Sequence, residues 1–453
     1  MSVGFIPPDL LNALKKAAAE VRAHDTVRVL GHYDGDGTSA VIILTRALER
    51  EGIRYQAGFI KELDAENFRK RMMEAPDLFT IVVDAGSDQL RFVPDMENVL
   101  VLDHHFYNRA TVKGMNINAR DFGIDGTRGA CGATMAFAFS LAMSEENSDS
   151  FPFMLSGAIA DKQDIGGFTG LNRAIIEALG PNYRSIRGPN LEGETLAEAI
   201  AFSTDPFFRD LSGSMERTEE FLRGIGLDPA RRLAELTEDE KAQAINALAA
   251  WLISQGAGSE AIRYTETDLY IFDQYGLSSK DISGIIDGNA KVGRNGVPVQ
   301  FFLGDEGVRQ EMLANWKTYK GKLIDYAYRA SKEIFEEQNV RYFYAPESEM
   351  AGSIAGLLTL YVLPQDKPLI GFNVGDGTTK VSSRASRRLV ERGLNLSTVM
   401  AEASREVGGT GGGHDIAAGA SIPKGRERQF VEIVGRLVGI QLNGKAGQGA
   451  SAE

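Results

Sequence analysis

The first third of the chain alternates short apolar runs with longer amphipathic stretches, and this alternation constrains the fold more than any other feature. Strand-like runs occupy residues 27–30, 54–60, 79–83 and 99–102, a weaker one occupies residues 115–118, and residues 38–50 follow a helical pattern. Runs that are apolar throughout are typical of strands buried on both faces of a sheet. Helices between such strands connect them in parallel. We therefore predict an α/β fold, with a doubly wound and mostly parallel sheet in the N-terminal part.

The pattern changes after residue 188. Residues 189–260 are largely helical and strongly charged, strand-like pieces return at residues 267–272 and 297–303, and a long helical pattern without proline covers residues 308–338. Strand-like runs at residues 340–344 and 369–374, followed by a glycine-rich stretch, indicate a second α/β domain. The predicted organisation is an N-terminal domain (1–188), a mainly helical insertion (189–260), a return to the first domain (261–307), a connecting helix (308–339), a smaller C-terminal α/β domain (340–442) and a flexible tail (443–453).

Composition narrows the classes of function. The 453 residues carry a formal net charge of −13, which argues against a protein that coats nucleic acid along its whole surface but allows a local basic strip. A single cysteine, Cys131, excludes an intramolecular disulfide framework and a cysteine zinc site. No run of about 18 apolar residues occurs, and the N-terminus lacks the basic start and apolar stretch of a signal peptide. We therefore expect a cytoplasmic protein without a membrane partner.

Four of the five histidines lie in three short segments rich in aspartate or glycine. The first segment, residues 31–38, reads Gly-His-Tyr-Asp-Gly-Asp-Gly-Thr and directly follows a strand-like run. Alternate aspartates beside a histidine, with glycines that permit tight turns, can bring three ligands onto one ion. A calcium loop starts in a similar way, but position twelve counted from Asp34 is Thr45 rather than the required glutamate. A metal-binding loop and a plain surface turn are the two alternatives for this segment taken alone.

Acidic and histidine residues also follow two further strands, at the points where those strands end. Asp84 follows one apolar run, and Asp103, His104 and His105 follow the next. A carboxylate beside imidazoles is a donor mixture that suits manganese or zinc. Because ligands collect at the carboxyl ends of strands in open parallel sheets, we expect these residues to converge. Asp161 ends a further apolar run with a helical pattern, where either a cation or a solvated helix end accounts for it.

The glycine-rich stretch near the C-terminus contains Gly411, Gly412, Gly413 and His414. Glycines permit close backbone approach to a phosphate, although a bare glycine run is more often a flexible linker. Upstream, residues 380–392 carry five basic residues against one acid. A solvated helix face and a phosphate-binding surface account equally well for that run, and Arg384 is its strongest candidate for phosphate binding.

Taken in order, these pieces resemble the signature of a known family. His-x-Asp-x-Asp-Gly, a strand-end Asp, Asp-His-His and a later Asp resemble the ordered motifs of the DHH phosphoesterases over residues 27–165. Gly-Gly-Gly-His-x-x-Ala-Ala-Gly at residues 411–419 and Ser-x-Arg at residues 382–384 are similar to elements of the associated DHHA1 domain. The helical middle and the long helix resemble the archaeal RecJ-like enzymes, including the GINS-associated nuclease.

The resemblance implies a set of site residues. Two divalent ions, Mn²⁺ in first place and Mg²⁺ as the alternative, are expected at His32, Asp34, Asp36, Asp84, His104 and Asp161, with Asp84 bridging them. Asp103 is expected to orient His104, and His105 to face the substrate phosphate. The DHHA1 part is expected to hold nucleic acid through Ser382, Arg384, Gly411, Gly412, Gly413 and His414.

By the same resemblance, the expected function is that of a metal-dependent exonuclease, which hydrolyses single-stranded DNA or RNA to 5′-mononucleotides in DNA replication or repair. One alternative is a phosphodiesterase for oligoribonucleotides or other small nucleotides, although such relatives are usually shorter. Another is an inactive replisome subunit that binds the GINS complex and the replicative helicase. Relatives of that kind lose metal ligands, whereas every core aspartate and histidine is present in this chain.

Overall fold

The computed structural model describes residues 3–444, which form two compact units. The first unit combines the chain up to Ile186 with Asp268–Tyr319, and the second combines Arg187–Thr267 with the chain from Lys320 onward. Of the predicted tail at 443–453, residues 445–453 lie outside the described part of the chain. No helix within residues 3–444 has the length and apolar character that a membrane span requires.

The first unit is built on a five-stranded sheet in which every pair of neighbouring strands is parallel. Its order is β2-β1-β3-β4-β5, formed by β1 (Thr26–His32), β2 (Arg54–Ile60), β3 (Phe79–Val83), β4 (Val99–Asp103) and β5 (Met115–Asn118). All residues of β3 and β4 are buried, as their continuous apolar runs predict. The predicted strands of the N-terminal part are therefore confirmed.

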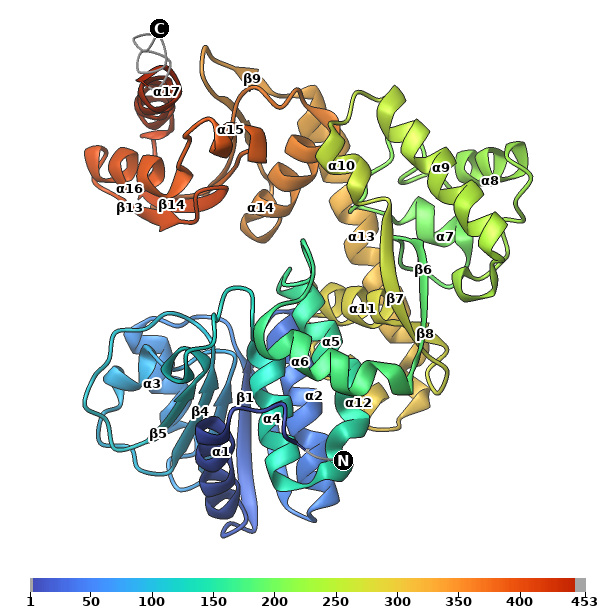
Figure 1. Cartoon of the computed structure of the whole chain (residues 1–453). Helices are drawn as coiled ribbons and strands as arrows, with labels where there is room; N and C mark the ends of the chain where they lie inside the picture. Colours follow the sequence, from blue (N-terminus) through green and yellow to red (C-terminus); the bar gives the residue numbers. More distant parts are fainter. Residues whose placement is uncertain (1–2, 445–453) are drawn as a thin grey trace, which may run out of the picture. The chain divides into compact units, whose positions relative to one another are not determined.

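Helices cover both faces of this sheet (Figure 1), so the predicted doubly wound α/β fold is also confirmed. On one face α3 (Ala65–Met73) and the short η1 (Gln89–Phe92) pack on the strands through Phe68, Met72 and Leu90. The other helices of the N-terminal segment are α1 (Pro8–Val21), α2 (Gly35–Arg50), α4 (Gly132–Met143), α5 (Phe151–Ala160) and α6 (Gly170–Leu179), joined by the short turns η2 (Ala119–Phe122), η3 (Glu145–Ser150) and η4 (Gly180–Asn182). Helix α2 is buried along most of its length, because it packs on β1 and also on α4 and α5.

The segment that returns to the first unit contains one wrong prediction. Residues 267–272 lie in β7 (Glu266–Phe272) as expected, and β7 joins β6 (Arg184–Pro189) and β8 (Leu277–Ser278) in a small sheet. Residues 297–303, predicted as a strand, instead follow α11 (Ser279–Lys291) as the helix α12 (Gly296–Phe302). Short apolar runs do not distinguish a buried strand from a buried helix. Pro298 fits the first turn of a helix, where its missing N–H costs no hydrogen bond.

The second unit holds the helical insertion and the C-terminal α/β domain together. Its helices are α7 (Leu196–Ala201), α8 (Met215–Gly224), α9 (Glu238–Ser254), α10 (Ser259–Arg263), α14 (Ser348–Leu357), α15 (Arg387–Glu391), α16 (Leu396–Glu406) and α17 (Glu427–Gly444), with the short turns η5 (Leu233–Glu235) and η7 (Leu358–Val362). After the turn η6 (Glu306–Val308), the connecting helix α13 (Arg309–Lys332) ends earlier than the pattern predicts, because residues 335–336 form a strand.

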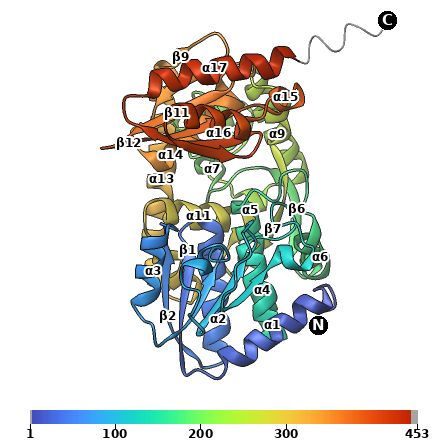
Figure 2. The same ribbon diagram turned by 90° about the vertical axis from the view of Figure 1, so that its left-hand side faces the viewer.

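The C-terminal sheet has six strands in the order β13-β14-β12-β11-β10-β9 and mixes parallel with antiparallel pairs. Its strands are β9 (Phe335–Glu336), β10 (Arg341–Tyr344), β11 (Leu369–Val374), β12 (Thr378–Arg384), β13 (Thr410–Gly413) and β14 (Ala417–Pro423). Helices α16 and α17 pack on one face through an apolar core, and α14 packs on β11 and β12 (Figure 2). The smaller C-terminal α/β domain is thus confirmed.

Hydrogen bonds tie the helical insertion to this C-terminal domain. The Tyr361 hydroxyl donates to Asp205 over 2.5 Å, and Gln255 donates to the carbonyl oxygens of Phe207 and Tyr361 over 3.0 and 2.9 Å. Residues 189–260 therefore extend the C-terminal domain rather than the first α/β domain.

Candidate metal centre

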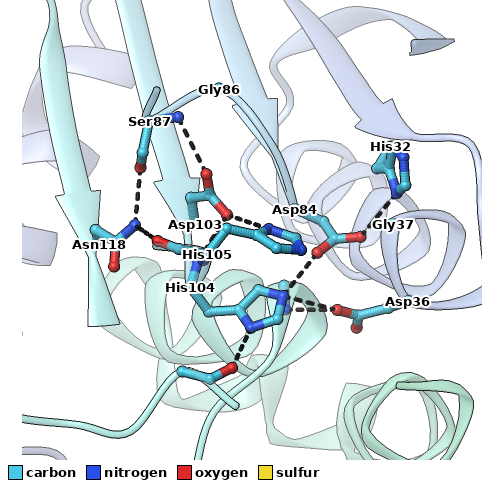
Figure 3. A network of polar contacts seen from close by, with 12 residues as sticks. His32, Asp36, Gly37, Asp84, Gly86, Ser87, Asp103, His104, His105 and Asn118 are labelled. Carbon is cyan, nitrogen blue, oxygen red and sulfur yellow. Dashed lines mark hydrogen bonds and ion pairs between the residues drawn. The ribbon is translucent and has the colours of Figure 1, made fainter. Parts of the chain in front are cut away.

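Three strand ends meet at one edge of the parallel sheet. In the register of the sheet Gly31 lies beside Val83, and Val83 lies beside Leu102, so the residues that follow these three positions lie at the same level. Figure 3 shows the side chains of His32, Asp84 and His104 turned toward a common centre. The predicted convergence at the carboxyl ends of the strands is therefore what the chain adopts.

Seven side chains form three overlapping groups of potential metal ligands. In each group, one ligand atom from every residue lies within 4.8 Å of the others. The groups are His32–Asp34–Asp84, Asp84–His104–His105 and Asp36–His104–Asp161. Asp84 and His104 each belong to two groups, so the set is continuous. All six predicted metal residues are brought together, and His105 joins them.

Backbone amides at helix N-termini hold the carboxylates of the first motif in place. Asp34 caps α2 by accepting the Gly37 amide over 3.0 Å, and Asp36 sits in the first turn of that helix. The Asp36 carboxylate also accepts the amides of Gly132 (2.6 Å) and Ala133 at the N-terminus of α4. Helix N-termini favour negative charge, which accounts for a carboxylate that is almost fully buried.

Asp161 lies at the opposite end of a helix, where its charge is disfavoured. It follows α5 directly and accepts a hydrogen bond from Gln163 over 2.8 Å. Burial, and after it the charge of Asp36, raises the pKa of Asp161 to about 7. An acid held in this position needs a cation for compensation, in agreement with the metal alternative for this residue.

The centre of the cluster carries more negative charge than its protein surroundings compensate. Burial, followed by the charges of Asp36 and Asp34, raises the pKa of Asp84 to about 8. Burial alone lowers the pKa of His104, but its hydrogen bond to Asp84, 3.1 Å long, outweighs this and raises that pKa well above the usual value. Buried carboxylates and imidazoles in mutual contact form a donor set that suits a divalent cation such as Mn²⁺. The donor set therefore fits the metal that the sequence predicts.

The orientation of His104 differs in one respect from the prediction. Its Nδ1 lies 2.5 Å from the carbonyl oxygen of Gly126, which turns Nε2 toward Asp84. Asp103 contacts the ring of His105 instead, with its Oδ1 2.9 Å from Nδ1. Asp103 also accepts the backbone amides of Ser87, His104 and His105. Asp103 thus orients the His105 ring and the backbone of the motif, while a carbonyl oxygen orients the His104 ring.

An Asp103→Asn substitution is expected to lower the free energy of unfolding by about 3 kcal/mol at pH 7, because hydrogen bonds to a buried charge are lost. Burial would raise the pKa of Asp103, but the hydrogen bond from His105 outweighs it and holds this pKa below its usual range. A depressed carboxyl pKa stabilises the fold above the unfolded-state value of about 3.9, and this stabilisation is lost as the pH falls toward the folded-state value. Urea unfolding of both proteins at pH 7 and pH 3.5 should show a smaller difference at pH 3.5. An equal difference at both pH values would contradict this account.

Several residues of the site carry no sequence signal. Asn118, at the end of β5, donates to Ser87 and to the His105 carbonyl oxygen over 2.9 and 3.0 Å. Asn295 donates to the Tyr33 carbonyl oxygen over 2.6 Å, and Lys291 lies 5.7 Å from the Tyr33 ring centroid. These contacts join positions far apart in the chain, so no local pattern marks them. They hold the first motif in place from α11 and the turn after it.

A second group of predicted residues lies in the C-terminal sheet. Ser382 is aligned with Gly419, and Gly419 is aligned with Gly412, so the Ser-x-Arg and glycine elements form one row across β12, β14 and β13. Gly411, Gly412 and Gly413 lie in β13, and the His414 amide donates to the Ala417 carbonyl oxygen over 2.8 Å, so this run is an ordered strand rather than a linker. Burial lowers the pKa of Arg384, whose guanidinium donates to the Ser383 carbonyl oxygen.

Two protein-family models match the segments that contain the strand-end cluster and the C-terminal row of residues. A model of the DHH family, N-terminal domain, matches residues 26–161, and a model of the DHHA1 domain matches residues 339–439. An uncharacterized protein of Methanocaldococcus jannaschii is 30% identical over 439 residues, which cover 92% of this chain and 94% of that protein.

Solved structures with a similar fold are more distant in sequence. RecJ in complex with Mn²⁺ from Thermus thermophilus has a TM-score of 0.59 at 16% identity, and the match covers 96% of this chain but 56% of that one. This chain thus spans little more than half of that RecJ. An exonuclease RecJ bound to manganese has a TM-score of 0.57 at 17% identity, with 96% of each chain covered. CDC45 from Entamoeba histolytica has a TM-score of 0.61 at 11% identity, covering 94% of this chain and 99% of that one.

At these identities the solved structures establish a shared fold, whereas the matched models and the relative aligned nearly end to end establish descent. The ordered motifs, the strand-end cluster and the C-terminal row of Ser382, Gly419 and Gly412 occur in the segments that the two models match. This chain therefore belongs to the DHH/DHHA1 superfamily, and its fold is similar to that of RecJ.

Proposed function

We propose that this chain is a metal-dependent exonuclease that hydrolyses single-stranded DNA or RNA to 5′-mononucleotides. One observation supports this above the others: seven acids and histidines, most of them buried or half-buried, form a continuous set in which Asp84 and His104 each serve two ligand groups. Such sharing is the arrangement that two neighbouring divalent ions require. The intact set also disfavours a purely structural replisome subunit, which would have no need of it.

The residues divide the chemistry between them. Two divalent ions, Mn²⁺ or Mg²⁺, supply Lewis-acid activation of water and charge stabilisation at the phosphate when bound. Asp84 would help to hold both ions, with His32 and Asp34 as further ligands of one ion and Asp36, His104 and Asp161 as ligands of the other. The His105 side chain is 55% exposed, and Asp103 engages its Nδ1, which leaves Nε2 to meet the substrate phosphate. His105 is therefore the proposed catalytic residue, and Asp103 positions it.

The C-terminal row is the proposed nucleic-acid site, formed by Ser382, Arg384, Gly411, Gly412, Gly413 and His414. Arg384 supports this assignment best, because it is half-buried and no carboxylate pairs with it in the described part of the chain. A half-buried cation without an acid partner suits a phosphate. Partnership with the GINS complex and a role in replication or repair rest on the family resemblance alone, and no residue is assigned to them.

An Arg384→Ala substitution is expected to raise KM for a single-stranded oligonucleotide about tenfold, because one charge-assisted contact to phosphate is lost. Stabilisation by Mn²⁺ in thermal unfolding should not change, since Arg384 lies in the second unit. Arg388→Ala is the matched control, because Arg388 is an exposed arginine in the same stretch. Equal effects of the two substitutions would show unspecific attraction between charges instead of a phosphate site.

The proposed function is tested by digestion of 5′- and 3′-end-labelled single-stranded DNA and RNA with Mn²⁺ or Mg²⁺. Bis(p-nitrophenyl) phosphate, a phosphodiester without a nucleobase, is assayed beside them. The variant Asp84→Asn serves as the inactive enzyme, and Asp77→Asn, which changes an exposed aspartate of the same unit, serves as its control. The exonuclease is supported if the wild type and Asp77→Asn release mononucleotides in the presence of the metal and Asp84→Asn does not.

Other outcomes of this assay are equally informative. Cleavage of dinucleotides and of the small diester, but of no longer strand, replaces the exonuclease by a small-nucleotide phosphodiesterase. Absence of all cleavage, together with absence of any shift in thermal unfolding on addition of Mn²⁺, overturns the metal-dependent hydrolase and favours the replisome subunit.

A further inference from the structure

The side chain that directly follows the Asp-His-His motif is a phenylalanine that faces solvent. Phe106 is 75% exposed, the highest value among the large apolar side chains that are exposed within residues 3–444. A single exposed apolar side chain needs no explanation in general. Phe106 differs because its chain neighbour His105 belongs to the candidate metal set.

Hydrogen bonds on both sides hold the backbone that carries Phe106. The His105 carbonyl oxygen before it accepts the Asn118 amide group over 3.0 Å. The Tyr107 hydroxyl after it donates to Asp121 over 2.6 Å, and the Asn108 amide donates to Asp88 over 3.2 Å. The aromatic ring is thus presented from an anchored segment rather than from a free loop end.

An arginine beside the Asp-His-His motif favours an anionic ligand. Residues 104–114 contain no acid, but Arg109 pairs with Asp121 over 2.6 Å and Lys113 pairs with Glu97 over 3.1 Å, so neither of these two cations is left for a ligand. Arg120 donates from Nε to the His104 carbonyl oxygen over 3.0 Å and from Nη2 to the Thr127 hydroxyl over 3.0 Å. Its guanidinium, for which no carboxylate partner is found among residues 3–444, therefore lies beside the motif.

We propose that Phe106 stacks on a nucleobase of single-stranded nucleic acid, at the nucleotide whose phosphate lies at the metal set. Consecutive Cα atoms are about 3.8 Å apart, so a residue next to His105 is within reach of the base attached to that nucleotide. Every base has a flat π-face, and aromatic platforms next to cations are the common means of binding single strands without sequence preference. This inference rests on the proposed nuclease function and adds the group that recognises the base.

Binding tests the inference without hydrolysis. The full chain is titrated, with Ca²⁺ in place of Mn²⁺, into an oligonucleotide that carries 2-aminopurine at successive positions from either end, and intactness of the strand is checked on the same samples. Stacking quenches 2-aminopurine, so the wild type should quench it at one terminal position. Phe106→Ala and Phe106→Leu should lose this quenching and weaken binding about tenfold, whereas Phe106→Trp should retain both. Loss of quenching with Leu as well as Ala separates stacking from simple apolar contact.

Turnover separates this inference from the proposed function. The measured quantity is the ratio of kcat/KM for the oligonucleotide to kcat/KM for bis(p-nitrophenyl) phosphate, in the presence of Mn²⁺. Phe106→Ala should lower this ratio about tenfold, and Met73→Ala, which removes another apolar side chain with 53% exposure in the same unit, should leave it unchanged. An unchanged ratio in Phe106→Ala, or an equal fall for both substrates, overturns the stacking role while the nuclease stands. A wild type that cleaves only the small diester overturns the nuclease, and the stacking role with it.

Discussion

Asp84→Asn is expected to lower Mn²⁺-dependent hydrolysis by about a thousandfold or more while leaving the metal-free protein at least as stable as the wild type. The loss of activity follows from the position of Asp84, which is 2% exposed and is shared by two ligand groups. A carboxamide keeps the size of the side chain but removes the charge that attracts the cations. Asn also tolerates the backbone of this residue, whose φ is +61°, whereas Ala at this position would add strain.

The stability of the metal-free protein should change in the opposite direction. Burial and the charges of Asp36 and Asp34 raise the pKa of Asp84 to about 8, far above the unfolded-state value of about 3.9. The folded protein therefore binds more protons than the unfolded chain between these values, so wild-type stability falls as the pH rises from about 4 to about 8. The Asn side chain of the variant does not titrate, so the variant does not lose stability in this way as the pH rises. The advantage of the variant should grow over that range and stay constant above it.

Thermal unfolding with EDTA at pH 6 and pH 8, and with Mn²⁺ at pH 8, measures both effects. The wild type should gain stability when Mn²⁺ is added, and Asp84→Asn should gain much less. Asp77→Asn, at an exposed position, should follow the wild type throughout. Retention of hydrolysis by Asp84→Asn would remove Asp84 from the metal site. A metal-free variant that is less stable at pH 8 than the wild type would show that the cluster is compensated in some other way.

Gly132→Ala is expected to lower hydrolysis by about a hundredfold or more through the addition of one methyl group. A Cβ at residue 132 would lie 2.3 Å from Cβ and 2.6 Å from Cγ of Asp84. Because Cβ of Asp84 is attached to its backbone, rotation of the side chain cannot relieve this contact, so the start of α4 or the end of β3 must move. The amide of Gly132 also donates to Asp36. The substitution thus displaces two proposed ligands at once, and a misplacement of about 1 Å can cost about a hundredfold in rate.

The same overpacking should lower the free energy of unfolding by about 1–3 kcal/mol. Gly296→Ala is the control, because Gly296 also begins a helix of the first unit, and its Cβ would meet no atom within 4 Å. Hydrolysis and the response to Mn²⁺ in thermal unfolding are measured for both variants. If Gly132→Ala behaves like Gly296→Ala, the close packing of α4 against Asp84 is not required for the site.

The accuracy of the sequence-based predictions follows the strength of the local signal. Residues 79–83 and 99–102 are almost entirely apolar and rich in Val and Ile or Leu, and they were recognisable as strands because such runs recur between helical patterns, as in a parallel sheet buried on both faces. Residues 297–303 are equally apolar but form α12, since a short run without a clear period fits either structure. No local pattern in the sequence indicated that the helical insertion packs with the C-terminal domain. The hydrogen bonds that join them, such as the one from Tyr361 to Asp205, link residues 156 positions apart.

The acids and histidines that the structure brings together, and the order in which they follow the strands, were predictable from the amino-acid sequence. This was possible because strand, strand end and acidic or histidine residue are consecutive, so the motifs that contain His32, Asp84 and Asp103 are each visible within a few residues. The fold class then requires that parallel strand ends meet at one edge.

The orientation of these side chains, and the groups that hold them, depend on contacts that form only on folding. The Gly126 carbonyl oxygen orients the ring of His104, the α4 amides hold Asp36, and Asn295 supports the first motif from 257 to 262 positions away. A backbone carbonyl or amide is present at every residue apart from the missing proline N–H, so the sequence cannot mark the one that is used. Which of them reaches the site is set by the packing of helices that are distant in the chain, and that packing exists only in the folded protein.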